Sequence, residues 1–289
     1  MLLCIMTRGR VGKQETLKWI PKEWEPHVRL MCPYEEKPYH QANHPTIKII
    51  DQPSFVTNYS LKFEWLVYEA FPEENNIVIM DDDLYFNRFE NPDNTGKLLT
   101  IKDRQEVGPM FNLMAHMTKE IALVGVHPRM MANNANRPFQ WNSKIVTIQA
   151  INRSLIPSGL RLSKHPILAD VELNCQLLSR GIANARITTH FVDWLPSQAT
   201  GGCDYRTAEM QRLATEDIST RFAPFAKQVV KRPKTAKWLG DERYDLNIRW
   251  KDLYNWGLDR REKATNLLDR GEGEDTSGEG EGAPQAVVP

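Results

Sequence analysis

Four short apolar runs, separated by polar loops and helical segments, constrain the fold of this chain most strongly. Residues 2–6 (LLCIM) and 77–80 (IVIM) have the continuous apolar character of strands buried on both faces, and further strands are predicted at 28–32 (VRLMC) and 47–50 (IKII). Residues 58–70 carry large apolar side chains at helical spacing. Strands that alternate with helices indicate βαβ units. The sequence therefore predicts an α/β fold, with a mixed sheet flanked by helices.

The middle of the chain continues this pattern with one helix and three strands. Residues 167–180 show helical spacing and are followed by Gly181, a typical residue after a helix C-terminus. Apolar runs predict strands at 121–126, 144–151 and 185–191. We expect these strands to join the same sheet.

Charge is distributed unevenly along the 289 residues. Lys+Arg and Asp+Glu number 37 each, which excludes a polybasic protein held to nucleic acid or membrane by bulk charge. Residues 221–263, in contrast, hold 12 Lys and Arg against 6 Asp and Glu. We expect three parts: a core at 1–205, a basic helical extension at 206–265, and an acidic tail at 266–289. The Gly-rich tail has too few apolar residues to fold and is expected to be disordered.

Cysteine spacing and the lengths of the apolar runs indicate a cytoplasmic protein without a membrane segment. The four cysteines form no CxxC pair, so we expect reduced thiols. The first apolar run precedes Arg8 and Arg10, the reverse of the charge order in a signal peptide. The longest apolar runs, such as 121–126, are too short to cross a bilayer. No sequence feature indicates an obligate protein partner.

Three consecutive acids, Asp81, Asp82 and Asp83, follow the strand predicted at 77–80. Ligands of open α/β sheets bind beyond the carboxyl ends of the strands, where these acids fall. Adjacent carboxylates repel one another, and a divalent cation such as Mg²⁺ or Mn²⁺, which prefers oxygen ligands, offsets that repulsion. The triplet therefore predicts a metal or nucleotide site. A solvated acidic turn, or an N-terminal cap of the next element, is the alternative.

A basic loop, Thr7-Arg8-Gly9-Arg10, follows the first predicted strand and precedes a short helix predicted at 14–20. Two guanidinium groups beside a glycine, just before a helix N-terminus, make a candidate diphosphate site. The loop has neither the GK[ST] of a P-loop nor a GxGxxG motif. A solvated basic turn explains the same residues equally well.

Two acids and one histidine later in the chain are further candidate site residues. Asp170 and Glu172 fall in the first turn of the helix predicted at 167–180, where the helix dipole favours carboxylates. The same field keeps a carboxylate ionised, as a general base requires. His190 lies near the end of the strand predicted at 185–191, and a structural role is its alternative.

The order of these elements over residues 2–205 resembles a GT-A glycosyltransferase, a Rossmann-like fold that binds a nucleotide sugar in its first half. IVIMDDD resembles the strand of the family's metal-binding DxD motif, with Asp81 and Asp83 as the motif acids. ADVELNCQLLSRG resembles the family's later acidic helix segment. It departs from the family pattern in Ala169, where an acid often stands, and in Glu172, where Asp is usual.

This resemblance implies specific roles for the acids and the histidine. Asp170 corresponds to the catalytic base of inverting members, with Glu172 beside it. Asp83 and His190 hold Mn²⁺ or Mg²⁺ against the diphosphate of a UDP-sugar, and Asp81 reaches the ribose or the sugar or assists the metal. The other residues expected to bind the nucleotide are Thr7, Arg8, Gly9, Arg10, Glu35, Lys62 and Asp82.

A finer resemblance concerns the acceptor. TRGR at 7–10, IVIMDDDLYF at 77–86 and Gly201-Gly202 are similar to the TET-associated glycosyltransferases of bacteriophages. This similarity implies transfer of a hexose to the hydroxymethyl group of 5-hydroxymethylcytosine in DNA.

DNA as the acceptor gives two further segments candidate roles. The modified base must leave the duplex stack, and the loop at 127–142 has the polar and aromatic residues to fill or read that space. The basic extension has the charge to follow phosphates. An ordinary surface loop and a solvated helical face are the respective alternatives. Two other functions stay open: a transferase of this fold acting on a glycan, lipid or protein, and a non-catalytic DNA-binding accessory protein.

Overall fold

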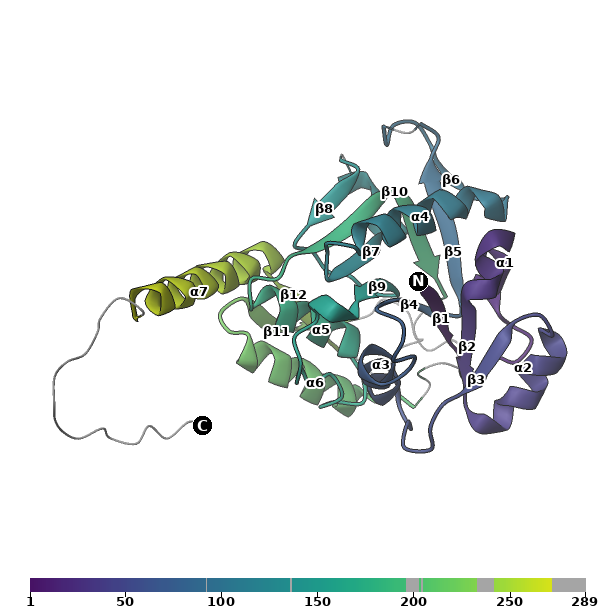
Figure 1. The fold of residues 1–289 in the computed structure, drawn as a ribbon, viewed down its shortest axis with the longest axis horizontal. Helices are drawn as coiled ribbons and strands as arrows, with labels where there is room; N and C mark the ends of the chain where they lie inside the picture. Colours follow the sequence, from purple (N-terminus) through teal and green to yellow (C-terminus); the bar gives the residue numbers. More distant parts are fainter. Residues whose placement is uncertain (92, 136, 196–202, 204, 233–241, 272–289) are drawn as a thin grey trace.

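The computed structural model describes residues 1–271 except 92, 136, 196–202, 204 and 233–241. A 10-stranded mixed sheet crosses the molecule in the order β3-β2-β1-β4-β9-β7-β10-β5-β6, and β8 pairs with β10 (Figure 1). The α/β class with helices flanking a mixed sheet is confirmed. Its strands are β1 (Leu2–Met6), β2 (Val28–Cys32), β3 (Lys48–Asp51), β4 (Asn76–Asp81), β5 (Leu84–Phe89), β6 (Leu98–Thr100), β7 (Leu123–Pro128), β8 (Phe139–Trp141), β9 (Ile148–Asn152) and β10 (Asn184–Trp194).

The first four strands are parallel, so their carboxyl ends lie at one edge of the sheet. Met6 of β1 is opposite Asp81 of β4, which places the loop after β1 beside the Asp triplet. β9 runs antiparallel to both β4 and β7, and β5 runs antiparallel to β10. The register therefore brings two sequence motifs about 75 residues apart to the same place.

Both faces of the central strands are buried, which explains why β1 and the centre of β4 are continuous apolar runs. Leu3 and Ile5 pack on one face with helix α4 (Gly108–Met117), whereas Leu2 and Cys4 pack on the other. That second face is covered by α3 and α5 (Figure 1). The remaining helices are α1 (Glu15–Lys18), α2 (Lys37–Asn43), α3 (Tyr59–Tyr68), α5 (Ala169–Leu178), α6 (Ala208–Arg221) and α7 (Trp250–Gly271).

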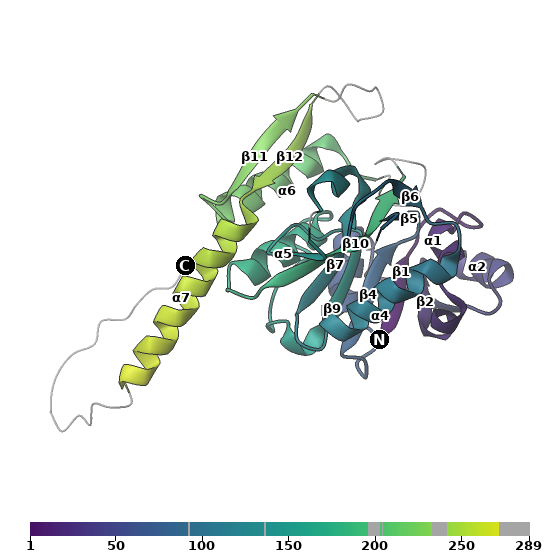
Figure 2. The same ribbon diagram turned by 90° about the horizontal axis from the view of Figure 1, so that it is seen from above.

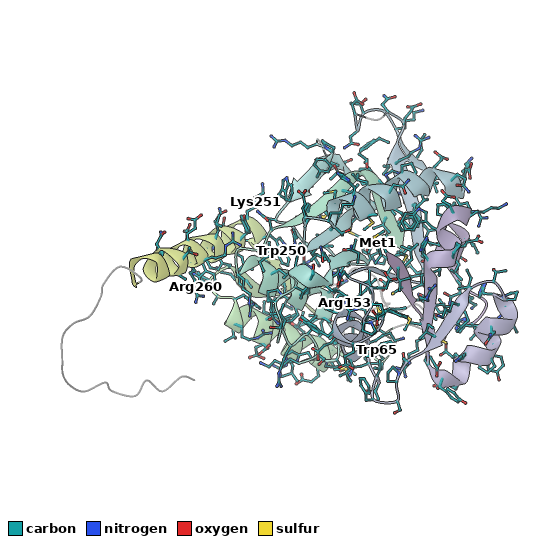
Figure 3. All side chains as sticks on the ribbon, viewed as in Figure 1. Met1, Trp65, Arg153, Trp250, Lys251 and Arg260 are labelled. Carbon is teal, nitrogen blue, oxygen red and sulfur yellow. The ribbon has the colours of Figure 1, made fainter. Side chains whose placement is uncertain are left out.

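Arg153 fixes the C-terminal end of α3 to the sheet. Its guanidinium donates hydrogen bonds to the carbonyl oxygens of Val67, Ala70 and Phe71 at 2.7 to 2.8 Å. Figure 3 labels Arg153 and also Trp65 of α3. A cation at a helix C-terminus satisfies carbonyls without helical partners and complements the helix dipole. The other end of α3, with its first residue Tyr59, is thereby held toward the carboxyl edge of the sheet.

The segment predicted as a helical extension contains a β-hairpin, so that prediction is wrong in part. β11 (Ala226–Lys231) and β12 (Arg243–Ile248) form a two-stranded antiparallel sheet between α6 and α7. Gln228 of β11 donates hydrogen bonds to the Arg212 carbonyl and the Thr215 hydroxyl of α6, both at 2.8 Å. The basic charge of this segment carries no information about its secondary structure, whereas the packing of the hairpin on α6 stabilises the two strands.

Two segments differ from the expected loop and tail. The loop predicted at 127–142 contains a 3₁₀ helix (Arg129–Asn134) and strand β8. α7 continues to Gly271, beyond the predicted start of the tail at residue 266, and projects away from the sheet (Figure 2). The remainder of the tail lies outside the described residues. The four cysteines are free thiols. Among the described residues, no helix combines the length and apolar character needed to cross a bilayer.

Candidate active site

A cavity of about 280 Å³ lies at the carboxyl ends of β1 and β4. Its walls come from the loop after β1, the Asp triplet after β4, and the first turns of α3 and α5. The segment after β10 and strand β12 of the hairpin complete it. Ligand cavities of α/β proteins lie at this edge of the sheet. The predicted core and the C-terminal hairpin therefore build one site together.

Arg10 holds two of the three adjacent acids. Its Nη1 atom lies 2.5 Å from Asp82 Oδ1 and 2.8 Å from Asp83 Oδ2, and these three side chains are at most 10% exposed. Thr7 donates a hydrogen bond from its hydroxyl to Asp82 Oδ2 at 2.5 Å. Burial alone would lower the pKa of Arg10, but the two carboxylates outweigh it and raise that pKa. Arg10 and the acids at 82 and 83 thus form an ion-paired cluster, with one cation between two carboxylates.

Thr16 of α1 fixes the backbone of the triplet. Its hydroxyl donates to the Asp81 carbonyl at 2.7 Å and accepts from the Leu84 amide at 2.9 Å. Its own amide donates to the Asp82 carbonyl at 3.1 Å. The turn between β4 and β5 is consequently held from both sides, which sets the direction of the Asp81 side chain.

Asp81 and Asp170 also line the cavity, and their environment differs from that of the ion-paired cluster. Neither carboxylate forms an ion pair with a described residue. Burial raises the pKa of Asp81 well above its usual value, and the charges of Asp83, Asp82 and Asp170 raise it further. Burial also raises the pKa of Asp170, against the lowering effect of Lys144. Two carboxylates with raised pKa values in one cavity are typical of functional sites.

The other acid of the α5 segment, Glu172, points away from the cavity, which corrects its predicted catalytic role. Arg221 of α6 holds both Glu172 carboxylate oxygens, at 2.7 and 2.5 Å, and Gln176 donates to the same carboxylate at 2.7 Å. Residues two apart on a helix face roughly 200° apart, because each residue turns the helix by about 100°. Glu172 therefore ties α5 to α6, whereas Asp170 faces the cavity.

His190 does not reach the Asp triplet, so its predicted role as a metal ligand beside Asp83 is also wrong. Strand register places His190 opposite Arg88, five residues along β5 from Asp83 and thus roughly 16 Å away at about 3.3 Å per residue. Its Nε2 atom lies 3.1 Å from the Glu106 carbonyl oxygen. Burial lowers the pKa of His190, which favours its neutral form.

The predicted nucleotide-binding residues divide into those that line the cavity and those that do not. Arg8 lines it, donates to the Thr57 carbonyl at 3.0 Å, and lies 5.5 Å from the ring centroid of Tyr205. Lys62 lines it too and donates from Nζ to the Thr7 carbonyl at 3.1 Å. Burial lowers the pKa of Lys62 to about 8.

Two predicted nucleotide-binding residues lie outside the cavity wall. Glu35 is exposed and does not line the cavity. Its neighbour Glu36 accepts a hydrogen bond from the Gly9 amide at 2.8 Å. Gly9 has a φ of 67°, a conformation that glycine adopts at little cost, so its role is to turn the loop.

The cavity has further residues that the sequence motifs did not indicate. Tyr205 accepts a hydrogen bond from the Tyr59 amide at 2.7 Å and donates to the Pro166 carbonyl at 3.1 Å. The only sequence feature that pointed to the region around Tyr205 is the preceding Gly201-Gly202 pair, which lies outside the described residues. The other cavity-lining residues with charged or amide side chains that were not predicted are Gln52, Asn58, Lys144, Arg206, Gln211, Arg243 and Asp245.

Two cavity-lining residues with side chains adopt the left-handed backbone conformation. Thr147 has a φ of 65° and accepts a hydrogen bond from the Asp81 amide on its carbonyl oxygen at 3.2 Å. Leu168, directly before α5, has a φ of 70°. Such conformations cost about 1–3 kcal/mol each and gather at functional sites. Thr147 precedes β9 and is hydrogen-bonded to Asp81, and Leu168 precedes the helix that carries Asp170. Both strained residues therefore lie next to the two acids that form no ion pair.

No family model and no curated protein matches this sequence. Solved structures give low-identity matches. Mannose-1-phosphate geranyltransferase from Thermus thermophilus is 10% identical with a TM-score of 0.42, covering 92% of this chain and 99% of that one. 4-diphosphocytidyl-2C-methyl-D-erythritol synthase from Anaerococcus prevotii is 11% identical with a TM-score of 0.39, covering 64% and 85%. Mouse xyloside xylosyltransferase 1 is 10% identical with a TM-score of 0.31, covering 62% and 74%.

Proposed function

We propose that this chain transfers a hexose from a UDP-sugar to the hydroxymethyl group of 5-hydroxymethylcytosine in DNA. One observation carries the proposal: Asp81 and Asp170 face one cavity at the carboxyl ends of parallel strands, and neither forms an ion pair with a described residue. A carboxylate with a raised pKa is suited to take a proton near neutral pH. The other acids of the region, Asp82 and Asp83, are held by Arg10.

Asp170 acts as the general base in this proposal. Its carboxylate takes the proton of the acceptor hydroxyl while the hydroxyl oxygen forms a bond to the anomeric carbon of the sugar. The bond from that carbon to the diphosphate breaks, and UDP leaves with the electron pair. Attack opposite the leaving group inverts the anomeric configuration. Lys144 lowers the pKa of Asp170, which keeps a fraction of the base ionised.

Arg8 and Lys62 supply positive charge for the diphosphate. Both line the cavity, and neither forms an ion pair with a described carboxylate. The pKa of Lys62, lowered to about 8 by burial, rises again when an anion approaches, so phosphate binding and protonation of this amine support each other. Arg10, in contrast, is ion-paired with Asp82 and Asp83 and stabilises the structure of the site.

The residues present fit a divalent cation held chiefly by Asp81. Its half-buried carboxylate has no described hydrogen-bond donor, and adjacent negative charges raise its pKa, a repulsion that a cation relieves. The described residues contain no group of three or more His, Cys, Asp or Glu placed to hold a metal. Mg²⁺ and Mn²⁺ are commonly held by one or two carboxylates together with substrate phosphates. When bound, the cation offsets negative charge on the leaving diphosphate.

DNA as the acceptor is supported by the residues similar to the phage enzymes, at 7–10 and 77–86. Trp141 and Phe139 of β8 are 48% and 36% exposed, available for contact with a nucleic acid, although neither lines the cavity. Arg129, in the same segment, forms an ion pair with Asp193 at 2.9 Å. We therefore assign this segment to contact with the DNA outside the cavity.

Incubation with UDP-hexoses and an oligonucleotide containing 5-hydroxymethylcytosine tests the proposal. We expect a mass gain of one hexose on the modified nucleoside, dependent on Mn²⁺ or Mg²⁺ and lost in Asp81→Asn. Transfer to a glycan, lipid or protein, with no gain on the nucleoside for any UDP-hexose, would replace DNA with another acceptor. DNA binding without turnover of any UDP-sugar would indicate an accessory protein.

A further inference from the structure

A second, smaller cavity of about 50 Å³ continues the main one on the side of the C-terminal segment. Five residues line both: Lys144, Leu168, Val171, Gln211 and Asp245. About 10–15 Å³ of such space accommodates one water, so the smaller cavity has room for the edge of a ring. Val171 adjoins Asp170 in the first turn of α5, and the smaller cavity is therefore next to the proposed base.

Gln211 is the most informative residue of this smaller cavity. It lies in the first turn of α6, is 5% exposed, and its Oε1 atom has no hydrogen-bond partner among the described residues. A buried polar atom without a partner costs about 1–3 kcal/mol, and native structures contain few of them. Because Gln211 lines both cavities, a ligand there can supply the missing N–H or O–H donor.

The other walls of the smaller cavity have complementary character. Leu246, Ile248 and Trp250 form an apolar wall, and Trp250 is labelled at the start of α7 in Figure 3. Asp245 is occupied by Lys231 at 2.6 Å and by the Leu246 amide at 2.8 Å. Lys144 forms no ion pair with a described residue, so its ammonium group is available to donate. The cavity thus combines an apolar wall, one acceptor and one donor.

We infer that this smaller cavity is the acceptor subsite of the proposed transferase and that Gln211 determines which acceptor enters it. The inference rests on the proposed function. The ligand chemistry is a ring with an N–H or O–H donor beside an accepting atom: the donor bonds Gln211 Oε1, Lys144 donates to the accepting atom, and the ring face contacts Trp250. An aminopyrimidine base and a sugar ring both carry such an edge. Consequently Gln211 of α6, together with Leu246 and Ile248 of β12, selects the acceptor.

Acceptor binding in the presence of UDP tests this inference without requiring turnover. The probes are an oligonucleotide containing 5-hydroxymethylcytosine and a set of methyl hexosides, each titrated calorimetrically into the full-length protein. Gln211→Met keeps the shape of the side chain but removes the acceptor oxygen, whereas Gln211→Glu keeps an acceptor oxygen. Loss of one neutral hydrogen bond corresponds to a roughly 2- to 10-fold weaker acceptor Kd. We expect that change in Gln211→Met, with partial recovery in Gln211→Glu and an unchanged Kd for UDP.

Gln149→Met is the matched control, since Gln149 of β9 is 2% exposed, lines neither cavity, and donates its hydrogen bond within the fold, to the Ile145 carbonyl at 3.1 Å. It should lower stability and leave the acceptor Kd as in the wild type. The inference is overturned if both probes bind Gln211→Met and wild type equally, or if neither probe binds wild type that binds UDP. Failure of the proposed function gives a different result, absence of UDP binding to the wild-type protein.

Discussion

The cavity contains two pairs of carboxylates whose environments are opposite: one pair is ion-paired and the other is not. Asp82 and Asp83 share the Arg10 guanidinium at 2.5 and 2.8 Å, whereas Asp81 and Asp170 form no ion pair with a described residue. Asp81 adjoins the first pair in sequence but resembles Asp170 in its environment. The difference shows that the place of an acid in the cavity decides whether it stabilises the fold or is available for chemistry. Membership of the acidic motif does not decide it.

The largest expected effect concerns Asp170. Replacement of a positioned general base removes about 10²- to 10⁴-fold of the rate, so Asp170→Asn should lower kcat by that factor. Affinity for UDP should stay near that of the wild type, because the base contacts the acceptor. Steady-state hexose transfer and a UDP titration check both parts. Retention of most of the wild-type kcat would place the base elsewhere and remove the distinction between the two pairs.

Arg10 provides the converse test on the two ion-paired acids, Asp82 and Asp83. Arg10→Met leaves two buried carboxylates without their cation, and breaking a buried pair in this way costs about 3–5 kcal/mol of stability. Urea unfolding measures the loss. The triple variant Arg10→Met, Asp82→Asn, Asp83→Asn removes the unpaired charges and should recover a large part of it. An Arg10→Met protein as stable as the wild type would show that the cluster does not hold the frame.

A Glu172 variant tests whether the contrast between ion-paired acids and acids available for chemistry also holds within α5. Glu172→Gln weakens the link to Arg221, whose side chain is 32% exposed, so we expect a loss of about 1–2 kcal/mol rather than the full buried-pair value. The kcat of hexose transfer should stay close to that of the wild type. Thermal unfolding and kinetics on the same preparation measure the two quantities. A large fall in kcat without loss of stability would return Glu172 to the catalytic residues.

The smallest effect is expected at His190. His190→Gln removes the contact with the Glu106 carbonyl, 3.1 Å from Nε2, which costs about 1 kcal/mol at most. The metal concentration that gives half-maximal activity should not change. A clear rise in that concentration would mean that His190 approaches the metal in the bound state.

The elements that were predicted correctly are those with a clear pattern of apolar residues in the local sequence. β1 and the centre of β4 are continuous apolar runs because both of their faces are covered, and the Asp triplet follows β4 as expected. The errors involve information that a linear pattern lacks. Helix rotation turns Glu172 away from Asp170, and the register of β10 against β5 separates His190 from Asp83. Strands β11 and β12 are stabilised by packing on α6, which charge counting does not detect.

The pH dependence of kcat tests the central claim, that Asp81 and Asp170 form the reactive pair. Burial raises the pKa of Asp170, and a base works only when ionised, so kcat should rise with pH through an apparent pKa above the ordinary carboxyl value of 3.8. Asp170→Asn should lose this rise from its residual activity. The same rise persisting in Asp170→Asn would contradict the account.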